Sequence, residues 1–65
     1  MSLGMNIKLC RIKQGLTQGD LANKIGISQN HLCQIEGNNS TPSLATLDGI
    51  AEALDTTVSE LTKTE

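Results

Sequence analysis

The segment TQGDLANKIGISQNHLCQIE, residues Thr17–Glu36, contains two short helical patterns that meet at Gly26. Thr17 and Ser28 each precede one pattern, where a hydroxyl oxygen can accept a hydrogen bond from an otherwise unpaired amide of the first turn. Asp20, three residues after Thr17, can complete a capping box. Gly26 follows the first pattern, where the chain must turn with a positive φ. The segment therefore predicts two helices joined by a tight turn, the helix-turn-helix arrangement.

Apolar spacing predicts how these two helices face the core. At about 100° per residue, one face of helix 18–25 carries Leu21, Ala22 and Ile25, and one face of helix 29–36 carries Leu32 and Ile35. Ile27 in the turn joins them.

A first helix is expected over residues 5–14, MNIKLCRIKQ, with Gly15 as its stop. Ile7 and Cys10 lie on one face, together with Gln14 or Arg11, and Leu9 and Ile12 widen the apolar surface.

Two more helices are expected after the loop 37–43, which is rich in turn residues. Gly37 or Asn38 would end the helix before the loop, and Pro42 or Ser43 would open the helix after it. Helix 43–54 carries an apolar stripe that closes the core: Leu44, Leu47, Ile50, Ala51 and Leu54. A further capping-box pattern, Thr57 with Glu60, opens a short fifth helix whose Val58 and Leu61 are expected in the core.

The chain has room for one domain. Its 65 residues are 37% apolar with no aromatic side chain, so the core must consist of small and aliphatic residues. We expect the domain over residues 5–62, an expression-tag scar or flexible arm over 1–4, and a frayed end over 63–65. No apolar stretch approaches the roughly 20 residues needed to span a bilayer. A cytoplasmic protein without membrane association is predicted.

The residues that could carry catalysis or hold a metal are few. Cys10, Cys33 and His31 lack zinc-binding spacing, so Cys10 is expected in the core and Cys33 on the surface. Asp48 and Glu52, one helical turn apart, are explained by a solvated helix face. We therefore expect no enzymatic activity, no metal, no cofactor and no small-molecule ligand.

Charge is unevenly distributed along the chain. The net charge is −2, whereas a duplex-binding domain usually presents a basic face. Residues 1–43 hold four basic and two acidic side chains, and residues 44–65 hold one basic and five acidic. The acidic half is thus separate from the helix-turn-helix segment.

The exposed face of helix 29–36 would carry Asn30, Cys33 and Gln34, flanked by Gln29 and His31. Carboxamides offer a donor and an acceptor in one plane, which matches N6 and N7 of adenine in the major groove. Taken alone, such amides are equally typical of a solvated helix surface.

The ordered set of residues resembles the lambda-repressor and Cro-like helix-turn-helix family. The resemblance rests on these elements: Arg11, Gly15-Leu16-Thr17-Gln18, Leu21-Ala22, Gly26-Ile27-Ser28, Ile35-Glu36, Asn38, Pro42, and the apolar series from Leu44 to Leu54. It covers residues 5 to 62 and implies an all-α, compact bundle of five short helices.

The resemblance also implies roles for individual residues. Base contacts would come from Gln29, Asn30, Gln34 and His31. Phosphate contacts would come from Gln18, Ser28, Asn38, Asn39 and Ser40, although the basic residue that the family often has in this loop is absent here. Arg11 and Glu36 match a largely buried ion pair. For Gln18, an ordinary solvated position is the alternative.

These features together imply a sequence-specific regulator of transcription that binds double-stranded DNA as a homodimer. In relatives the C-terminal end of the domain often supplies the dimer contact. An interface is therefore the alternative location for Val58 and Leu61, which are otherwise expected in the core. The alternative function is a protein-interaction module, for example antitoxin-like, that keeps this fold with weak or no DNA binding.

Overall fold

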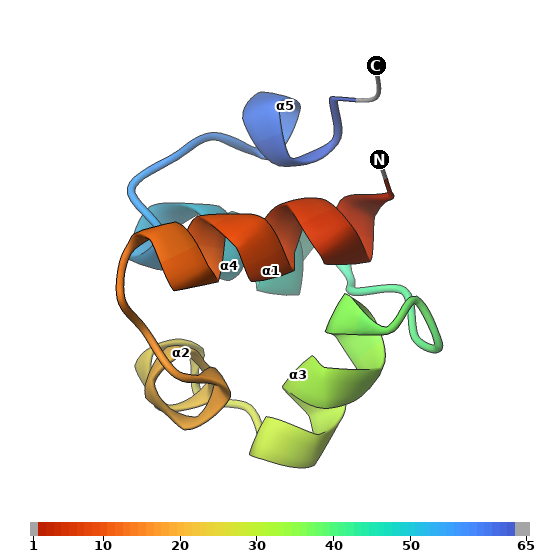
Figure 1. Cartoon of the computed structure of the whole chain (residues 1–65). Coiled ribbons are helices and arrows are strands. Elements are labelled where there is room, and N and C mark those ends of the chain that lie inside the picture. The colour runs from red at the N-terminus through yellow and green to blue at the C-terminus, as the bar shows by residue number, and fades with distance from the viewer. Residues whose placement is uncertain (1, 64–65) are drawn as a thin grey trace.

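The structure, a computed structural model, describes residues 2–63. Five α-helices lie within them: α1 (Leu3–Lys13), α2 (Gln18–Ile25), α3 (Gln29–Glu36), α4 (Leu44–Ala53) and α5 (Val58–Leu61). Figure 1 looks onto α1, with α4 behind it, α5 above it, and α2 and α3 below it. The predicted all-α bundle of five short helices is confirmed.

The two central helices begin and end where their capping residues predicted. Thr17 Oγ1 accepts from the amide of Asp20 at 3.0 Å, and Asp20 Oδ2 accepts from the amide of Thr17 at 3.0 Å. These hydrogen bonds hold the pKa of the Asp20 carboxyl below its ordinary value. Ser28 Oγ accepts from the amide of His31 at 3.0 Å, and Gly26 has φ 75°, the left-handed conformation expected of it.

The core lies between the inner faces of all five helices. Its buried apolar residues are Ile7, Leu21, Ala22, Leu32, Ile35, Leu47, Ile50, Ala51, Leu54 and Leu61. The prediction for Leu44 was wrong, because its side chain is 70% exposed. Leu44 is the first residue of α4, and no neighbouring part of the described chain covers that end of the helix.

The expectation of a flexible arm at 1–4 was wrong for Ser2–Gly4. Ser2 caps α1, and its Oγ accepts from the amide of Met5 at 3.2 Å and from Asn38 Nδ2 at 2.9 Å. The amide of Gly4 donates to Asn38 Oδ1 at 3.1 Å. The long-range contact with Asn38 is what orders this end. Met1, and Thr64 and Glu65 of the expected frayed end, lie outside the described residues.

Gly4 permits the close approach of α1 to the end of α3. A Cβ atom at this position would lie 2.5 Å from the carbonyl oxygen of Glu36 and 2.6 Å from that of Ile35. Only glycine therefore fits here without moving one helix away from the other.

A buried ion pair joins the same two helices. Arg11 Nε donates to Glu36 Oε2 at 2.7 Å and Arg11 Nη2 donates to Glu36 Oε1 at 3.1 Å, with both residues buried. Arg11 Nη1 donates to the carbonyl oxygen of Leu16 at 2.8 Å, which fixes the turn that leads into α2. The ion pair expected from the resemblance is thus present, and it is bidentate.

Two carboxamides, one within α1 and one directly after it, bind the carboxyl ends of other helices. Asn6 Nδ2 donates to the carbonyl oxygen of Leu61 at 2.8 Å and to that of Lys63 at 3.0 Å. Gln14 Nε2 donates to the carbonyl oxygen of Leu54 at 3.2 Å. These contacts attach α5 and the end of α4 to α1 by satisfying carbonyls that have no intrahelical partner.

Replacing Gly4 with Ala is expected to destabilise the domain by about 1–3 kcal/mol, because the new methyl group would press against backbone carbonyls of α3. Gly49→Ala is the matched control. A Cβ at Gly49 meets only Ile25, at 3.7–3.8 Å, so alanine there should stabilise α4 by about 0.5–1 kcal/mol. Urea unfolding of both variants measures the difference, and equal effects would show that the approach of α1 to α3 is not tight.

Arg11→Met is expected to cost about 3–5 kcal/mol, since it leaves the carboxylate of Glu36 buried without its partner. The double variant Arg11→Met, Glu36→Leu should recover most of that loss, because no buried charge then remains. Chemical unfolding followed by circular dichroism tests both. A double variant as unstable as the single one would show that the charge itself is not the source of the loss.

Candidate nucleic-acid interface

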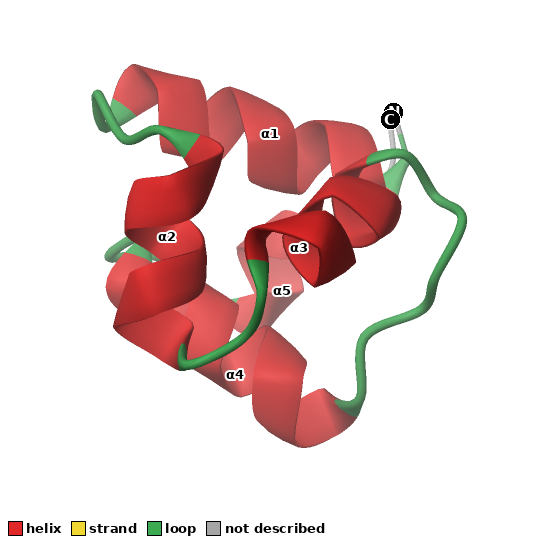
Figure 2. Cartoon of the chain, turned by 90° about the horizontal axis from the view of Figure 1, so that it is seen from below, coloured by secondary structure: helices red, strands yellow, loops and turns green. Residues whose placement is uncertain are grey.

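The outer face of α3 is an uncharged polar surface. Leu32, Ile35 and Glu36 are buried and fix the rotation of the helix about its axis. The remaining side chains are exposed and belong to Gln29, Asn30, His31, Cys33 and Gln34. Figure 2, seen from below, shows α3 in front of α1 and α5, so that this outer face is not covered by another helix.

Three of these exposed residues are carboxamides: Gln29, Asn30 and Gln34. Asn30 and Gln34 are separated by one helical turn and therefore project from the same side of α3. Gln29 lies on the side of α3 that faces α2. Its Oε1 is 3.5 Å from the position that a Cβ atom on Gly19 of α2 would occupy. Each carboxamide can donate and accept at once, as recognition of an adenine edge requires.

Gln18, expected to contact phosphate, is partly buried and bound to the ion pair. Its Nε2 donates to Glu36 Oε1 at 3.0 Å, so the carboxylate that accepts from Arg11 is also bound to α2. One N–H of the carboxamide and its oxygen remain for an external partner. No pattern in the sequence predicts the contact with Glu36, because it joins residues on different helices.

The loop after α3 uses most of its main-chain donors internally. The amide of Asn38 donates to the carbonyl oxygen of Ile35 at 3.1 Å, and the amides of Asn39 and Ser40 donate to that of Gln34 at 2.8 and 3.3 Å. Phosphate contacts from Asn39 and Ser40, which stay a prediction, would therefore come from their side chains. The side chain of Asn38 is also engaged, by Ser2 and Gly4, so its visible role is to hold the loop against α1.

The helix capping groups at the start of α3 leave one donor free. Ser28 Oγ accepts from the amide of His31, and a hydroxyl that accepts one hydrogen bond can still donate another. Ser28 thus keeps one side-chain donor at the start of α3.

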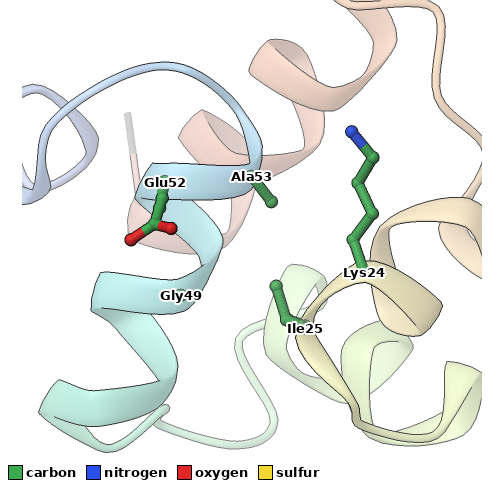
Figure 3. A pocket seen from close by; sticks show the side chains of 5 residues that line it. All are labelled: Lys24, Ile25, Gly49, Glu52 and Ala53. Carbon is green, nitrogen blue, oxygen red and sulfur yellow. The ribbon is translucent and has the colours of Figure 1, made fainter.

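The hollows of the described surface are shallow. Figure 3 shows one between α2 and α4, lined by Lys24, Ile25, Gly49, Glu52 and Ala53, in which the lysine and the glutamate lie on opposite rims. Within residues 2–63, no three His, Cys, Asp or Glu side chains are placed to hold a metal ion. No helix in this part of the chain is long and apolar enough to cross a membrane.

The sequence resembles regulators of bacteria and their phages. Residues 7–61 match the helix-turn-helix family HTH_3. The chain is 41% identical over 61 residues to the immunity repressor protein of Bacillus phage phi105, a match that covers 94% of this chain and 42% of the repressor. The chain thus spans less than half the length of that relative.

Solved structures show the same arrangement of helices. The P22 c2 repressor in complex with a synthetic operator superposes with a TM-score of 0.93 at 25% identity, over 100% of this chain and 98% of that one. SinR in complex with DNA gives 0.85 at 35% identity, over 91% and 95%. The restriction-modification controller protein C.AhdI of Aeromonas hydrophila gives 0.88 at 29% identity, over 91% and 89%.

The family match extends from α1 to α5 and includes both helices of the central unit. Proteins of this family bind DNA and are not enzymes, in agreement with the prediction made from the residues. The chain belongs to the HTH_3 family, the lambda-repressor-like helix-turn-helix DNA-binding domains.

Proposed function

We propose that this chain is the DNA-binding domain of a transcriptional regulator, which reads the major groove with α3 and acts as a homodimer on an inverted repeat. The observation that carries the proposal is the row of exposed carboxamides on α3, held in a fixed orientation by buried neighbours. A rigid helix that presents planar donor-acceptor groups is suited to reading base edges.

The base contacts we assign are those of Gln29, Asn30 and Gln34, with His31 at the edge of the contact. The exposed face of α3 carries no Arg or Lys that could bind O6 and N7 of guanine in bidentate fashion. The directly read pairs should therefore be mainly A·T.

Phosphate contacts would position the domain on the duplex. Gln18 and Ser28 lie at the starts of α2 and α3, where the helix dipole favours an anion. Asn39 and Ser40 would add side-chain donors from the loop after α3. Asn38 would act indirectly, since its side chain holds that loop on α1.

The weak electrostatic attraction of a single copy to DNA is the reason for proposing a homodimer. The net charge of −2 predicts low non-specific affinity, and one reading helix buries too little surface for tight specific binding. Two copies on half-sites about one helical turn apart would double the number of base contacts. DNA as the ligand also supports a cytoplasmic location.

The relatives support this function. SinR and the P22 c2 repressor are solved with DNA, and the phi105 protein is an immunity repressor. SinR is also solved in a complex with SinI. A protein partner is therefore part of the proposal for this chain as well.

The alternative is a protein-interaction module on the same fold. The negative net charge of the chain and the uncharged face of α3 favour it. Salt distinguishes the two functions. Duplex affinity falls steeply as salt rises, because binding releases counterions, whereas affinity for a protein partner need not.

Selection of bound duplexes from a random pool at low salt is expected to enrich an A·T-rich inverted repeat. The double variant Gln29→Ala, Gln34→Ala should lose this enrichment, because each well-placed amide contact contributes roughly 1–3 kcal/mol of discrimination. Glu52→Gln is the control, since Glu52 is an exposed residue on α4, outside both α3 and the candidate dimer contact.

Circular dichroism must first show that all three proteins are helical. Enrichment retained by the double variant would exclude α3 as the reading helix. Absence of enrichment with the folded wild-type protein would contradict DNA binding and favour the interaction module.

A further inference from the structure

The outer face of α1 carries an apolar stripe that nothing in the described structure covers. Met5, Leu9 and Ile12 are 42%, 43% and 55% exposed. Their spacing of four and three residues places them within about 60° of one another on the helix, in a stripe about 10 Å long. The stripe lies on the side opposite Ile7 and Arg11, so α1 is apolar toward the core and away from it.

A helix that is apolar on both sides is typically covered on both sides. Leu9 also lines a small hollow of about 230 Å³ between α1 and α5, together with Asn6, Cys10, Lys13 and Glu60. The stripe therefore continues into a depression that could receive a side chain from a partner.

Two lysines flank the stripe. At about 100° per residue, Lys8 lies on one side of Met5, Leu9 and Ile12, and Lys13 lies on the other. Both are exposed, and neither has a carboxylate within 4.0 Å among residues 2–63. An apolar strip between unpaired positive charges complements an apolar strip between negative charges.

A second copy of α1 fits this surface poorly. Packing α1 against α1 of another copy would bring Lys8 and Lys13 of both copies into one interface, with like charges facing each other. Among residues 2–63, three carboxylates that have no basic side chain within 4.0 Å, those of Asp48, Glu52 and Asp55, lie instead on and after α4. An α1–α4 contact between copies would close into a two-fold dimer only if α1 of each copy met α4 of the other within one shared patch.

We propose that the outer face of α1, formed by Met5, Leu9 and Ile12 between Lys8 and Lys13, binds an acidic amphipathic helix of a partner protein. Recognition follows the helix-in-groove mode, in which apolar residues at helical spacing supply the contact and charges select the partner. The surface is separate from the reading face of α3, because α1 turns its opposite side toward α3 through Ile7 and Arg11. The site is independent of DNA binding and leaves α3 free to contact a duplex.

The probe is a synthetic helical peptide with leucines at i, i+4, i+7 and i+11 and glutamates on both flanks. A second peptide carries lysines in place of the glutamates. Titration of the whole chain, followed by the methyl signals of Met5, Leu9 and Ile12, should show saturable binding of the acidic peptide only. The variant Leu9→Gln, Ile12→Gln should weaken this binding at least about tenfold, given the apolar area removed.

Leu44→Gln is the control, because Leu44 is an even more exposed leucine on a different helix. It should leave peptide affinity unchanged. The charge-reversed variant Lys8→Glu, Lys13→Glu should prefer the lysine peptide.

Several results would overturn the proposal. These are absence of binding at millimolar peptide, equal affinity for the two peptides, and equal loss in the Leu44→Gln control. Sedimentation showing that Leu9→Gln, Ile12→Gln abolishes self-association would assign the stripe to a second copy.

Discussion

The buried contact between Arg11 and Glu36 is the interaction on which the rest of the structure depends. Through it, α1 is fixed to the end of α3, and the third donor of Arg11 fixes the turn before α2 at Leu16. Gln18 completes the arrangement by binding the same carboxylate. Because a buried ion pair sets register more than it adds stability, its main effect is to place α3 at one angle and one rotation. Gly4 allows the close approach that this geometry needs.

The fixed core leaves two outer surfaces with different chemistry. The face of α3 is uncharged and rich in carboxamides, which suits base edges and contributes little electrostatic attraction. The face of α1 is apolar and flanked by lysines, which suits an acidic helix. A domain of 65 residues can thus hold a duplex and a protein partner on separate sides, so a partner could control the regulator without a sensor domain in this part of the chain.

Local signals in the sequence predicted the central helices well. Capping hydroxyls and Gly26 act on their own neighbours, so the bounds of α2 and α3 follow from a few adjacent residues. Contacts across the fold were not predictable in this way. The ordering of Ser2–Gly4 depends on Asn38, and the role of Gln18 depends on Glu36. The exposure of Leu44 and the engagement of loop amides likewise depend on which elements pack nearby. The carboxamide row was predicted, but its partners on DNA stay a prediction.

The most direct test of the account is a titration of the wild-type chain with the duplex enriched by selection, followed by nuclear magnetic resonance of side-chain signals. We expect the carboxamide NH₂ signals of Asn30 and Gln34 to shift in a saturable way, while the methyl signals of Leu9 and Ile12 stay unchanged. Such a result would place base recognition on α3 and leave the outer face of α1 free. Shifts confined to α1 and α5, with the α3 carboxamides unaffected, would contradict the account.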